Sequence, residues 1–213
     1  MKRQYMPKSW PIPRKGTAYI VKSKNYLEKS LPILIALRDM LKIATTKREV
    51  KQAIHLKNIL INEKPIKNEK GSLTLFDVLT IVPSKKNYKL TISKLGKLEL
   101  KEIDGNEKER KISKIINKKI LKGKKTQINL SDGRNFISDL KCNTNDSIII
   151  DFKKDKKISC LPLKEGAKVF IFEGKHSGEE GKIIKIDREK KMAELTAENK
   201  KINVLIKQLM VIE

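Results

Sequence analysis

Apolar residues recur at helical spacing mainly in one part of the chain, residues 30–44. A repeat of three to four residues predicts a helix there, with Ser30 as its N-cap and Pro32 in its first turn. The apolar positions of this repeat are Leu34, Leu37, Leu41 and Ala44. This pattern indicates a short helix buried along one face.

A second helix is predicted to begin directly after Thr46. The run from Thr46 to Glu49 has the form of a capping box, in which Thr46 caps the helix and Glu49 reaches back to it. Its apolar face would hold Val50, Ala53 and Ile54. Cations at spacings of four occupy another face, so this helix would present positive charge to its surroundings.

Elsewhere the pattern changes to short runs typical of strands. Before Pro83 such runs occupy 59–61 and 79–82, with turn-forming residues between 62 and 71. After Pro83 the expected strands are 88–92, 113–121, 126–130, 147–152, 157–161, 168–172, 182–186, 191–196 and 202–206. Short strands separated by Gly-containing turns favour small barrels over a parallel sheet. The predicted class is α+β.

The first 29 residues follow neither pattern. Up to Leu27 they contain seven basic residues and no acidic one, together with Pro7, Pro11, Pro13 and Gly16. Proline fixes φ and removes hydrogen-bond donors, so a regular helix is excluded. We expect an extended basic arm that becomes ordered only against a partner.

Charge narrows the choice of partner. The 213 residues include 49 Lys and Arg against 25 Asp and Glu, which gives a formal net charge of +24. A chain of this charge repels itself unless a polyanion neutralises it. Aromatic residues make up 5%, so stacking on large aromatic platforms is not expected to dominate binding.

Several other classes find no support in the sequence. No apolar run approaches the roughly 18 residues of a spanning helix, and the start has no apolar segment typical of a secretory signal. Cys142 and Cys160 form no C-x-x-C pair, and only two His residues accompany them. We expect no metal, no cofactor, no small-molecule substrate and no membrane partner.

The predicted second helix could form an anion site. A helix N-terminus offers free N–H groups to a phosphate, and Lys47 and Arg48 lie in its first turn. A solvated polar face is the plainer alternative for these residues. The following run, Leu60 to Ile66, resembles the strand-turn of the S-four RNA-binding fold, with Glu63 where that fold usually has Gly.

A glycine-punctuated segment lies near the C-terminus, at residues 165–183. Gly174, Gly178 and Gly181 separate two strand-like runs, and the order of residues fits neither a Walker loop nor a dinucleotide fingerprint. The segment resembles a KOW motif, whose glycines let a tight loop approach RNA phosphates. An exposed loop histidine remains the plainer reading of His176.

Four segments in order resemble one family. Residues 7–16, Pro-Lys-Ser-Trp-Pro-Ile-Pro-Arg-Lys-Gly, are similar to the amino-terminal signature of the small-subunit ribosomal protein S-four family, e type, in its archaeal form. Residues 31–42, 114–118 and 129–135 are similar to later segments of that family. Two departures are a shorter amino-terminal stretch and the turn at 122–124.

This resemblance implies four parts: a basic arm (1–29), an S-four-like module (30–83), a central β domain (84–162) and a KOW barrel (163–213). It further implies a structural, non-enzymatic protein of the small ribosomal subunit in the cytoplasm, bound to rRNA and to neighbouring ribosomal proteins. The residues expected to contact RNA are Lys8, Trp10, Arg14, Lys15, Arg38, Thr46, Lys47, Arg48, Lys51, Lys64, Lys175, His176 and Lys182.

Rival functions stay open at this point. A pseudouridine synthase would need a catalytic Asp, and Asp132 beside Arg134 superficially offers one, although Asp-Gly is also a common hairpin turn. A transcription factor of the KOW type and a general DNA-binding protein are further alternatives. The lack of a helix-turn-helix pattern weakens direct reading of base pairs.

Overall fold

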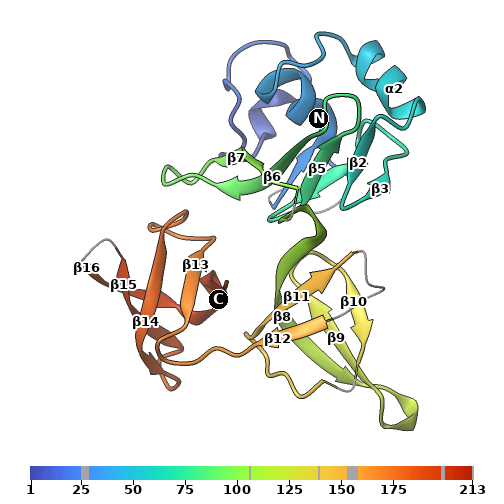
Figure 1. The fold of residues 1–213 in the computed structure, drawn as a ribbon. Helices are drawn as coiled ribbons and strands as arrows, with labels where there is room; N and C mark the ends of the chain where they lie inside the picture. Colours follow the sequence, from blue (N-terminus) through green and yellow to red (C-terminus); the bar gives the residue numbers. More distant parts are fainter. Residues whose placement is uncertain (25–28, 106, 139, 153–157, 198–199, 213) are drawn as a thin grey trace. The chain divides into compact units, whose positions relative to one another are not determined.

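A computed structural model describes residues 1–24, 29–105, 107–138, 140–152, 158–197 and 200–212 (Figure 1). Antiparallel strands make up most of the regular structure, and helices are few and short. The chain divides into a first unit, residues 1–93 with 97–109, and a second unit, residues 94–96 with 110–213. Among the described residues, none of the helices has the length and apolarity needed to cross a membrane.

The first unit contains a five-stranded antiparallel sheet in the order β3-β2-β5-β6-β7, and a separate pair of strands, β1 and β4. Its strands are β1 (Ser30–Pro32), β2 (Ile59–Ile61), β3 (Lys64–Pro65), β4 (Ser72–Thr74), β5 (Val78–Ile81), β6 (Lys86–Ile92) and β7 (Leu98–Ile103). The expected boundary after residue 83 falls between β5 and β6, which are hydrogen-bonded neighbours. The first sheet therefore extends further along the chain than expected.

The first helix differs from its prediction. Ser30 lies in β1 opposite Thr74, and is not an N-cap. The helix begins as α1 (Ile33–Ile35) and continues as a π-helical turn (Ala36–Met40). It ends early because Lys42 adopts a left-handed backbone, with φ of 53°. Serine is a residue type favoured at N-caps, but the Ser30 backbone pairs with β4 instead.

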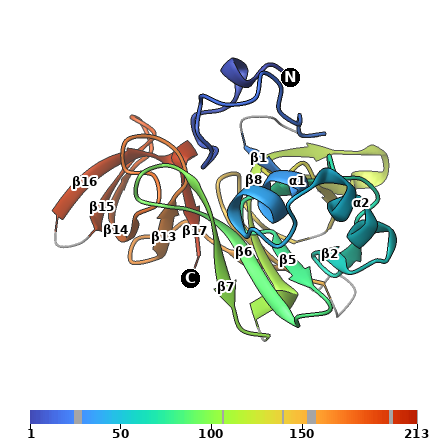
Figure 2. The same cartoon turned by 90° about the horizontal axis from the view of Figure 1, so that it is seen from above.

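The second helix, α2 (Lys47–His55), begins where the capping box predicts. The Glu49 N–H donates to the Thr46 hydroxyl (3.3 Å), and the Thr46 N–H donates to the Glu49 carboxylate (3.4 Å). Val50 and Ile54 are buried, as their spacing indicates. In both views α2 lies beside β2, the strand that follows it (Figures 1 and 2).

The N-terminal segment, residues 1–24, is folded onto the first unit, so the prediction of an arm ordered only by a partner is wrong for these residues. Met6, Trp10 and Ile20 belong to the core of the unit. The Leu98 N–H donates to the Ser9 carbonyl at 2.7 Å. The prolines exclude a regular helix, but they do not prevent these three apolar side chains from being buried. Residues 25–28 of the expected arm lie outside the described residues.

The second unit contains two five-stranded antiparallel sheets, in the orders β10-β9-β8-β11-β12 and β16-β15-β14-β13-β17. The strands of the first are β8 (Arg110–Ile120), β9 (Thr126–Leu130), β10 (Asn135–Ile137), β11 (Ser147–Asp151) and β12 (Ile158–Leu161). Those of the second are β13 (Lys168–Ile171), β14 (Glu180–Asp187), β15 (Met192–Ala197), β16 (Lys200–Leu205) and β17 (Leu209–Val211). Residue 157 of an expected strand is outside the described residues.

Each of these sheets packs its own apolar cluster. Among the described strands, β16 and β17 are the edges of the C-terminal sheet and no pairing closes it, so the expected KOW barrel stays a prediction. Two lysines of β8 are buried. Lys114 donates to the backbone carbonyls of Ile206 and Leu209, and Lys111 forms an ion pair with Asp132 at 2.8 Å. These two cations therefore serve the interior of the unit.

Candidate nucleic-acid interface

Helix α2 presents three cations to solvent: Lys47, Arg48 and Lys51. Lys47 Nζ lies 3.0 Å from a carboxylate oxygen of Glu69, whose side chain is only 11% exposed. The hydrogen bond from Lys47 lowers the pKa of Glu69, and the nearby charge of Lys51 lowers it further. Part of the positive charge of this face is therefore neutralised by a carboxylate of the same unit.

The two residues just before α2 are bound by the carboxylate of Glu49, which lies in the first turn of the helix. Glu49 accepts hydrogen bonds from the Thr45 N–H at 2.8 Å and from the Thr46 N–H, and these bonds, Thr45 first, lower the pKa of Glu49. The N–H groups of Thr45 and Thr46 are thus engaged within the chain. The first turn of the helix, with Lys47 and Arg48, begins after these two residues, and the phosphate site expected there stays a prediction. Thr46 acts as a cap.

β2 and β3 are joined by a tight turn of two residues, Asn62 and Glu63. Asn62 and Glu63 both adopt positive φ, 49° and 64°, as in a two-residue hairpin. The buried Asn62 amide donates to Asp77 at 2.7 Å and accepts from the Val78 N–H at 3.0 Å. This network fixes the turn with Glu63 at its second position, and Lys64 is exposed on β3.

Arg38 is less exposed than the cations of α2 and Lys64. Its guanidinium forms an ion pair with the neighbouring Asp39, with 2.9 Å between Nη2 and Oδ2, and both side chains are partly buried. The carboxylate offsets the charge that was expected to face RNA. Arg38 therefore offers less to an anion than the cations of α2.

In the N-terminal segment, Lys8, Arg14 and Lys15 are exposed, but Trp10 is only 1% exposed. The Trp10 indole N–H donates to the Ser30 carbonyl at 3.0 Å. Because the ring is packed into the core, it has no free face on which a base could stack. This corrects the prediction that Trp10 contacts RNA.

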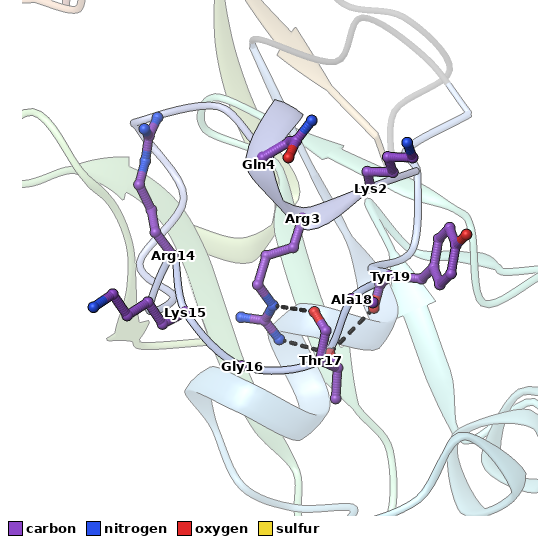
Figure 3. A pocket seen from close by; sticks show the side chains of 9 residues that line it. All are labelled: Lys2, Arg3, Gln4, Arg14, Lys15, Gly16, Thr17, Ala18 and Tyr19. Carbon is purple, nitrogen blue, oxygen red and sulfur yellow. Dashed lines mark hydrogen bonds between the residues drawn. The ribbon is translucent and has the colours of Figure 1, made fainter.

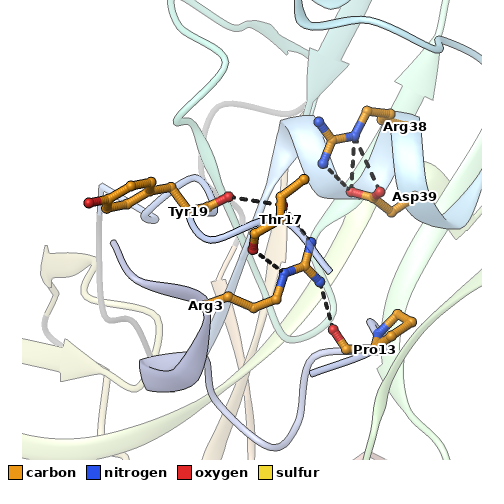
Figure 4. Close-up of polar contacts among 6 residues, drawn as sticks. All are labelled: Arg3, Pro13, Thr17, Tyr19, Arg38 and Asp39. Atoms are coloured by element: carbon orange, nitrogen blue, oxygen red, sulfur yellow. Dashed lines mark hydrogen bonds and ion pairs between the residues drawn. The ribbon is translucent and has the colours of Figure 1, made fainter. Parts of the chain in front are cut away.

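The same segment encloses a hollow of about 480 Å³ that the sequence did not reveal. It is lined by Lys2, Arg3, Gln4, Arg14, Lys15, Gly16, Thr17, Ala18 and Tyr19 (Figure 3). The Arg3 guanidinium donates to the Pro13 carbonyl, to the Thr17 carbonyl and to the Thr17 hydroxyl, at 2.6, 2.8 and 2.9 Å (Figures 3 and 4). Lys2, Arg3 and Tyr19 are absent from the predicted site, since only the closed loop brings them to Arg14 and Lys15.

The loop between β13 and β14 carries the C-terminal candidates. Gly174 and Gly178 adopt positive φ, 98° and 90°. The Gly178 N–H donates to the Ile171 carbonyl at 2.7 Å, which closes the loop. A side chain at Gly181 would place a Cβ 2.7 Å from the Thr196 carbonyl oxygen, so glycine is required there.

Of the three residues predicted here, Lys175 and Lys182 are exposed. His176 is half-buried, with Nδ1 3.4 Å from the Glu179 carboxylate. The loop therefore presents Lys175 at its tip, while His176 has a partner within the loop. Lys182 lies on β14 opposite Lys168.

Neither cysteine is placed for chemistry. Cys142 is buried and Cys160 half-buried, and both are free thiols. Burial, with Cys142 and Asp146 as neighbours, raises the pKa of Cys160 to about 12, so this thiol stays protonated at neutral pH. Within the part of the chain that the structure describes, no group of three or more His, Cys, Asp or Glu could hold a metal ion.

Comparisons with known proteins agree on one family. Residues 84–157 match the model of Ribosomal family S4e. The chain is 36% identical to small ribosomal subunit protein eS4 of Nanoarchaeum equitans, over 85% of this chain and 81% of that protein. It is 35% identical to the eS4 protein of Methanosphaera stadtmanae, over 87% and 78%. The chain belongs to the ribosomal S4e family.

A solved structure has a similar fold. The crystal structure of the 30S ribosomal protein S4e from Thermoplasma acidophilum superposes with a TM-score of 0.74 and covers 86% of this chain and 95% of that one. The two sequences are 24% identical, so this likeness speaks for the fold alone.

Proposed function

We propose that the chain is a structural constituent of the small ribosomal subunit that binds and stabilises rRNA. The observation that carries the proposal is the identity of 36% to a small ribosomal subunit protein across most of both chains. A formal charge of +24 supplies the physical reason for a polyanionic partner. Neighbouring ribosomal proteins and a cytoplasmic ribosome are parts of the same proposal.

Phosphate neutralisation is the proposed mechanism, supplemented by recognition of RNA shape. Three surfaces would take part: the N-terminal segment, the exposed face of α2 with Lys64, and the loop between β13 and β14. The order of α2, β2 and the hairpin supports an S-four-type module. The glycine-closed loop with Lys175 supports a KOW-type contact. Both module assignments belong to the proposal.

A modifying enzyme is the less favoured alternative. Asp132, the acid that such an enzyme would have to use, has a side chain only 4% exposed and is held 2.8 Å from the buried Lys111. A buried, paired carboxylate of this kind stabilises the interior and faces no substrate. This contact favours the structural role.

The salt dependence of binding tests the mechanism. The full chain would be titrated with small-subunit rRNA across a range of salt concentrations. If phosphate contacts dominate, log K falls linearly with log salt, by about 0.7 to 0.9 for each phosphate neutralised. An affinity that does not respond to salt would overturn the proposed mechanism.

A further inference from the structure

We propose that the hairpin formed by β8 and β9 enters a groove of double-helical rRNA and sets lysines of its two faces against the two phosphate backbones. This inference rests on the proposed function and adds a surface that the sequence did not indicate. The observation behind it is that residues 110–131, which form this hairpin, include eight basic side chains and no acidic one.

The lysines of the hairpin differ between its base and its tip. Near the base, Lys111 and Lys114 are buried and bind partners inside the second unit. Toward the tip, four lysines are at least partly open to solvent: Lys118, Lys119, Lys122 and Lys125. None of the ion pairs among the described residues involves these four side chains. The tip therefore offers its positive charge outward.

Neighbouring lysines of β8 lie on opposite faces of the hairpin. Lys118 is opposite Ile128 and Lys119 is opposite Gln127, and successive side chains of a strand point to opposite faces. Ile128 is fully buried, so the Lys118 face covers the apolar cluster nearer the base. Ile120 lies two residues further along that face and is 77% exposed, so the cluster ends before the tip. Both faces of the tip are therefore open to a partner.

The hairpin is held in this form by the chain itself. Ile115 anchors its base in the apolar cluster. At the tip the Leu121 N–H donates to the Lys125 carbonyl at 2.8 Å, and Gly123 turns the chain with φ of 80°. Figure 1 shows the tip, drawn in yellow-green, reaching beyond β10 and β11. A preformed hairpin binds without the cost of becoming ordered.

The Lys119 face also carries a row of amides. Asn117, Asn129 and Asn135 are aligned across β8, β9 and β10. The Gln127 amide lies on the same face and donates to the Asn129 side-chain oxygen at 2.8 Å. An amide both donates and accepts hydrogen bonds, as a 2′-hydroxyl does. Lysines beside amides therefore suit RNA better than an apolar protein partner.

A groove matches these features better than a flat anionic surface does. A flat surface would meet the lysines of one face and leave those of the other face without an anion. A strand pair with side chains on both faces is about 10 Å thick. In double-helical RNA the deep major groove is too narrow for side chains to read, whereas the minor groove is wide and displays 2′-hydroxyls. The minor groove is therefore the site that we assign to the hairpin.

Binding of a short fluorescein-labelled RNA duplex by the full chain, over a range of salt concentrations, tests this assignment. The hairpin variant combines Lys118→Gln, Lys119→Gln and Lys122→Gln. It should reduce the salt slope by about 2 to 3, because three phosphate contacts are lost. Ile120→Ser alters the tip without removing charge and should leave the slope unchanged. An unchanged slope in the hairpin variant would overturn the proposal and leave the tip to a protein partner.

The hairpin formed by β14 and β15 supplies a control of equal charge. Its turn carries the exposed cations Arg188, Lys190 and Lys191 together with Asp187 and Glu189. Lys190 Nζ lies 3.9 Å from the Asp187 carboxylate. Replacing the three cations by Gln should reduce the slope by less than about 1, because carboxylates already offset part of their charge. Equal reductions in the two triple variants would show that only net charge matters and would overturn the proposal.

Two further comparisons test insertion into a groove. Lys118→Gln and Lys119→Gln, made singly, should each lower the slope by about 0.9, because each face has its own row of phosphates. A loss at only one of them would mean that the RNA lies on one face, which contradicts insertion. The hairpin variant should also lose more affinity for the duplex than for either of its single strands. Equal losses on the duplex and the single strands would overturn the groove.

Binding of small-subunit rRNA by the wild type separates this inference from the proposed function. If the wild type binds rRNA and the two triple variants behave alike, only the hairpin assignment fails. If the wild type does not bind rRNA at all, the proposed function fails and the hairpin assignment fails with it. Urea unfolding midpoints equal to that of the wild type would show that the variants are folded.

Discussion

The N-terminal segment and helix α2 are both basic parts of the first unit, and they differ in how their cations are matched by carboxylates. On α2, Lys47 is paired with Glu69, and the helix N-terminus is capped by Glu49. In the N-terminal segment, Lys2, Arg14 and Lys15 line a hollow with no acidic residue among its lining residues.

The difference teaches that a count of basic residues overstates the charge available to RNA. Glu69 lies far from α2 in the sequence and reaches Lys47 only through the fold. Lys111 and Lys114 are removed from the surface altogether. Positive charge is most freely offered where the chain carries no carboxylate nearby, and the N-terminal segment is such a place.

The largest expected effect concerns the packing of the N-terminal segment. Trp10→Ala should destabilise the first unit by about 3–5 kcal/mol, because a fully buried ring and its hydrogen bond to Ser30 are lost. Urea unfolding of the full chain would measure this change, with Tyr5→Ala as a control that leaves the core intact. An unchanged unfolding midpoint for Trp10→Ala would mean that the segment is a loose arm after all.

The next effect compares the two basic surfaces directly. Replacing Lys2, Arg14 and Lys15 by Gln should reduce the salt slope of rRNA binding by about 2 to 3, which corresponds to three phosphate contacts. The same replacement of Lys47, Arg48 and Lys51 should weaken binding without unfolding the unit. Its reduction of the salt slope should be smaller by about one phosphate contact, because Glu69 already neutralises Lys47. Equal slopes for the two triple variants would remove the distinction between the surfaces.

A smaller effect is expected at the helix cap. Thr46→Ala should destabilise the first unit by about 1 kcal/mol, since the Glu49 N–H loses its acceptor. Thermal unfolding at neutral pH would measure the change, and Thr46→Ser, which keeps the hydroxyl, should restore most of it. A loss shared equally by both variants would argue against the capping role.

The smallest effect concerns Glu69. Its pKa lies below the ordinary value of 4.5, so its pairing with Lys47 stabilises the fold above that pH, and this contribution is lost as the pH falls through the lowered pKa. Lys47 is half exposed, so the contribution should stay below about 1 kcal/mol.

Glu69→Gln should therefore be less stable than the wild type at pH 7, and the difference should shrink between pH 4.5 and lower pH. It should also bind rRNA slightly more tightly, because Lys47 is released. Unfolding temperatures of the two proteins from pH 7 to pH 3 would check the first point. A stability difference that does not change with pH would show that the ion pair contributes nothing.

The sequence predicted the elements whose signals are local. The capping box of α2 and strands such as β9 (Thr126–Leu130) depend on neighbouring residues, and the structure has them as expected. β7 was not among the expected strands, although Leu98 and Leu100 carry part of an alternating pattern. The three-residue strands β1 (Ser-Leu-Pro) and β4 (Ser-Leu-Thr) lack the apolar run that indicated the equally short β2 (Ile-Leu-Ile).

The site was predicted less completely, for a physical reason. Trp10 stands among prolines and cations, and nothing local shows that the core of the unit accepts its ring. Arg3 contacts the loop from Pro13 to Thr17 only in the folded chain, so Lys2 and Tyr19 could not be associated with Arg14 in advance. Long-range contacts decide which residues are buried and which cations are free.

Sedimentation of the native protein in a sucrose gradient of cell lysate, before and after a high-salt wash, tests the central claim most directly. The account predicts stoichiometric protein in the small-subunit peak, and this protein should survive the wash because recognition of RNA shape, unlike the phosphate contacts, does not depend on low salt. Slow sedimentation away from the subunits would contradict a structural role in the ribosome.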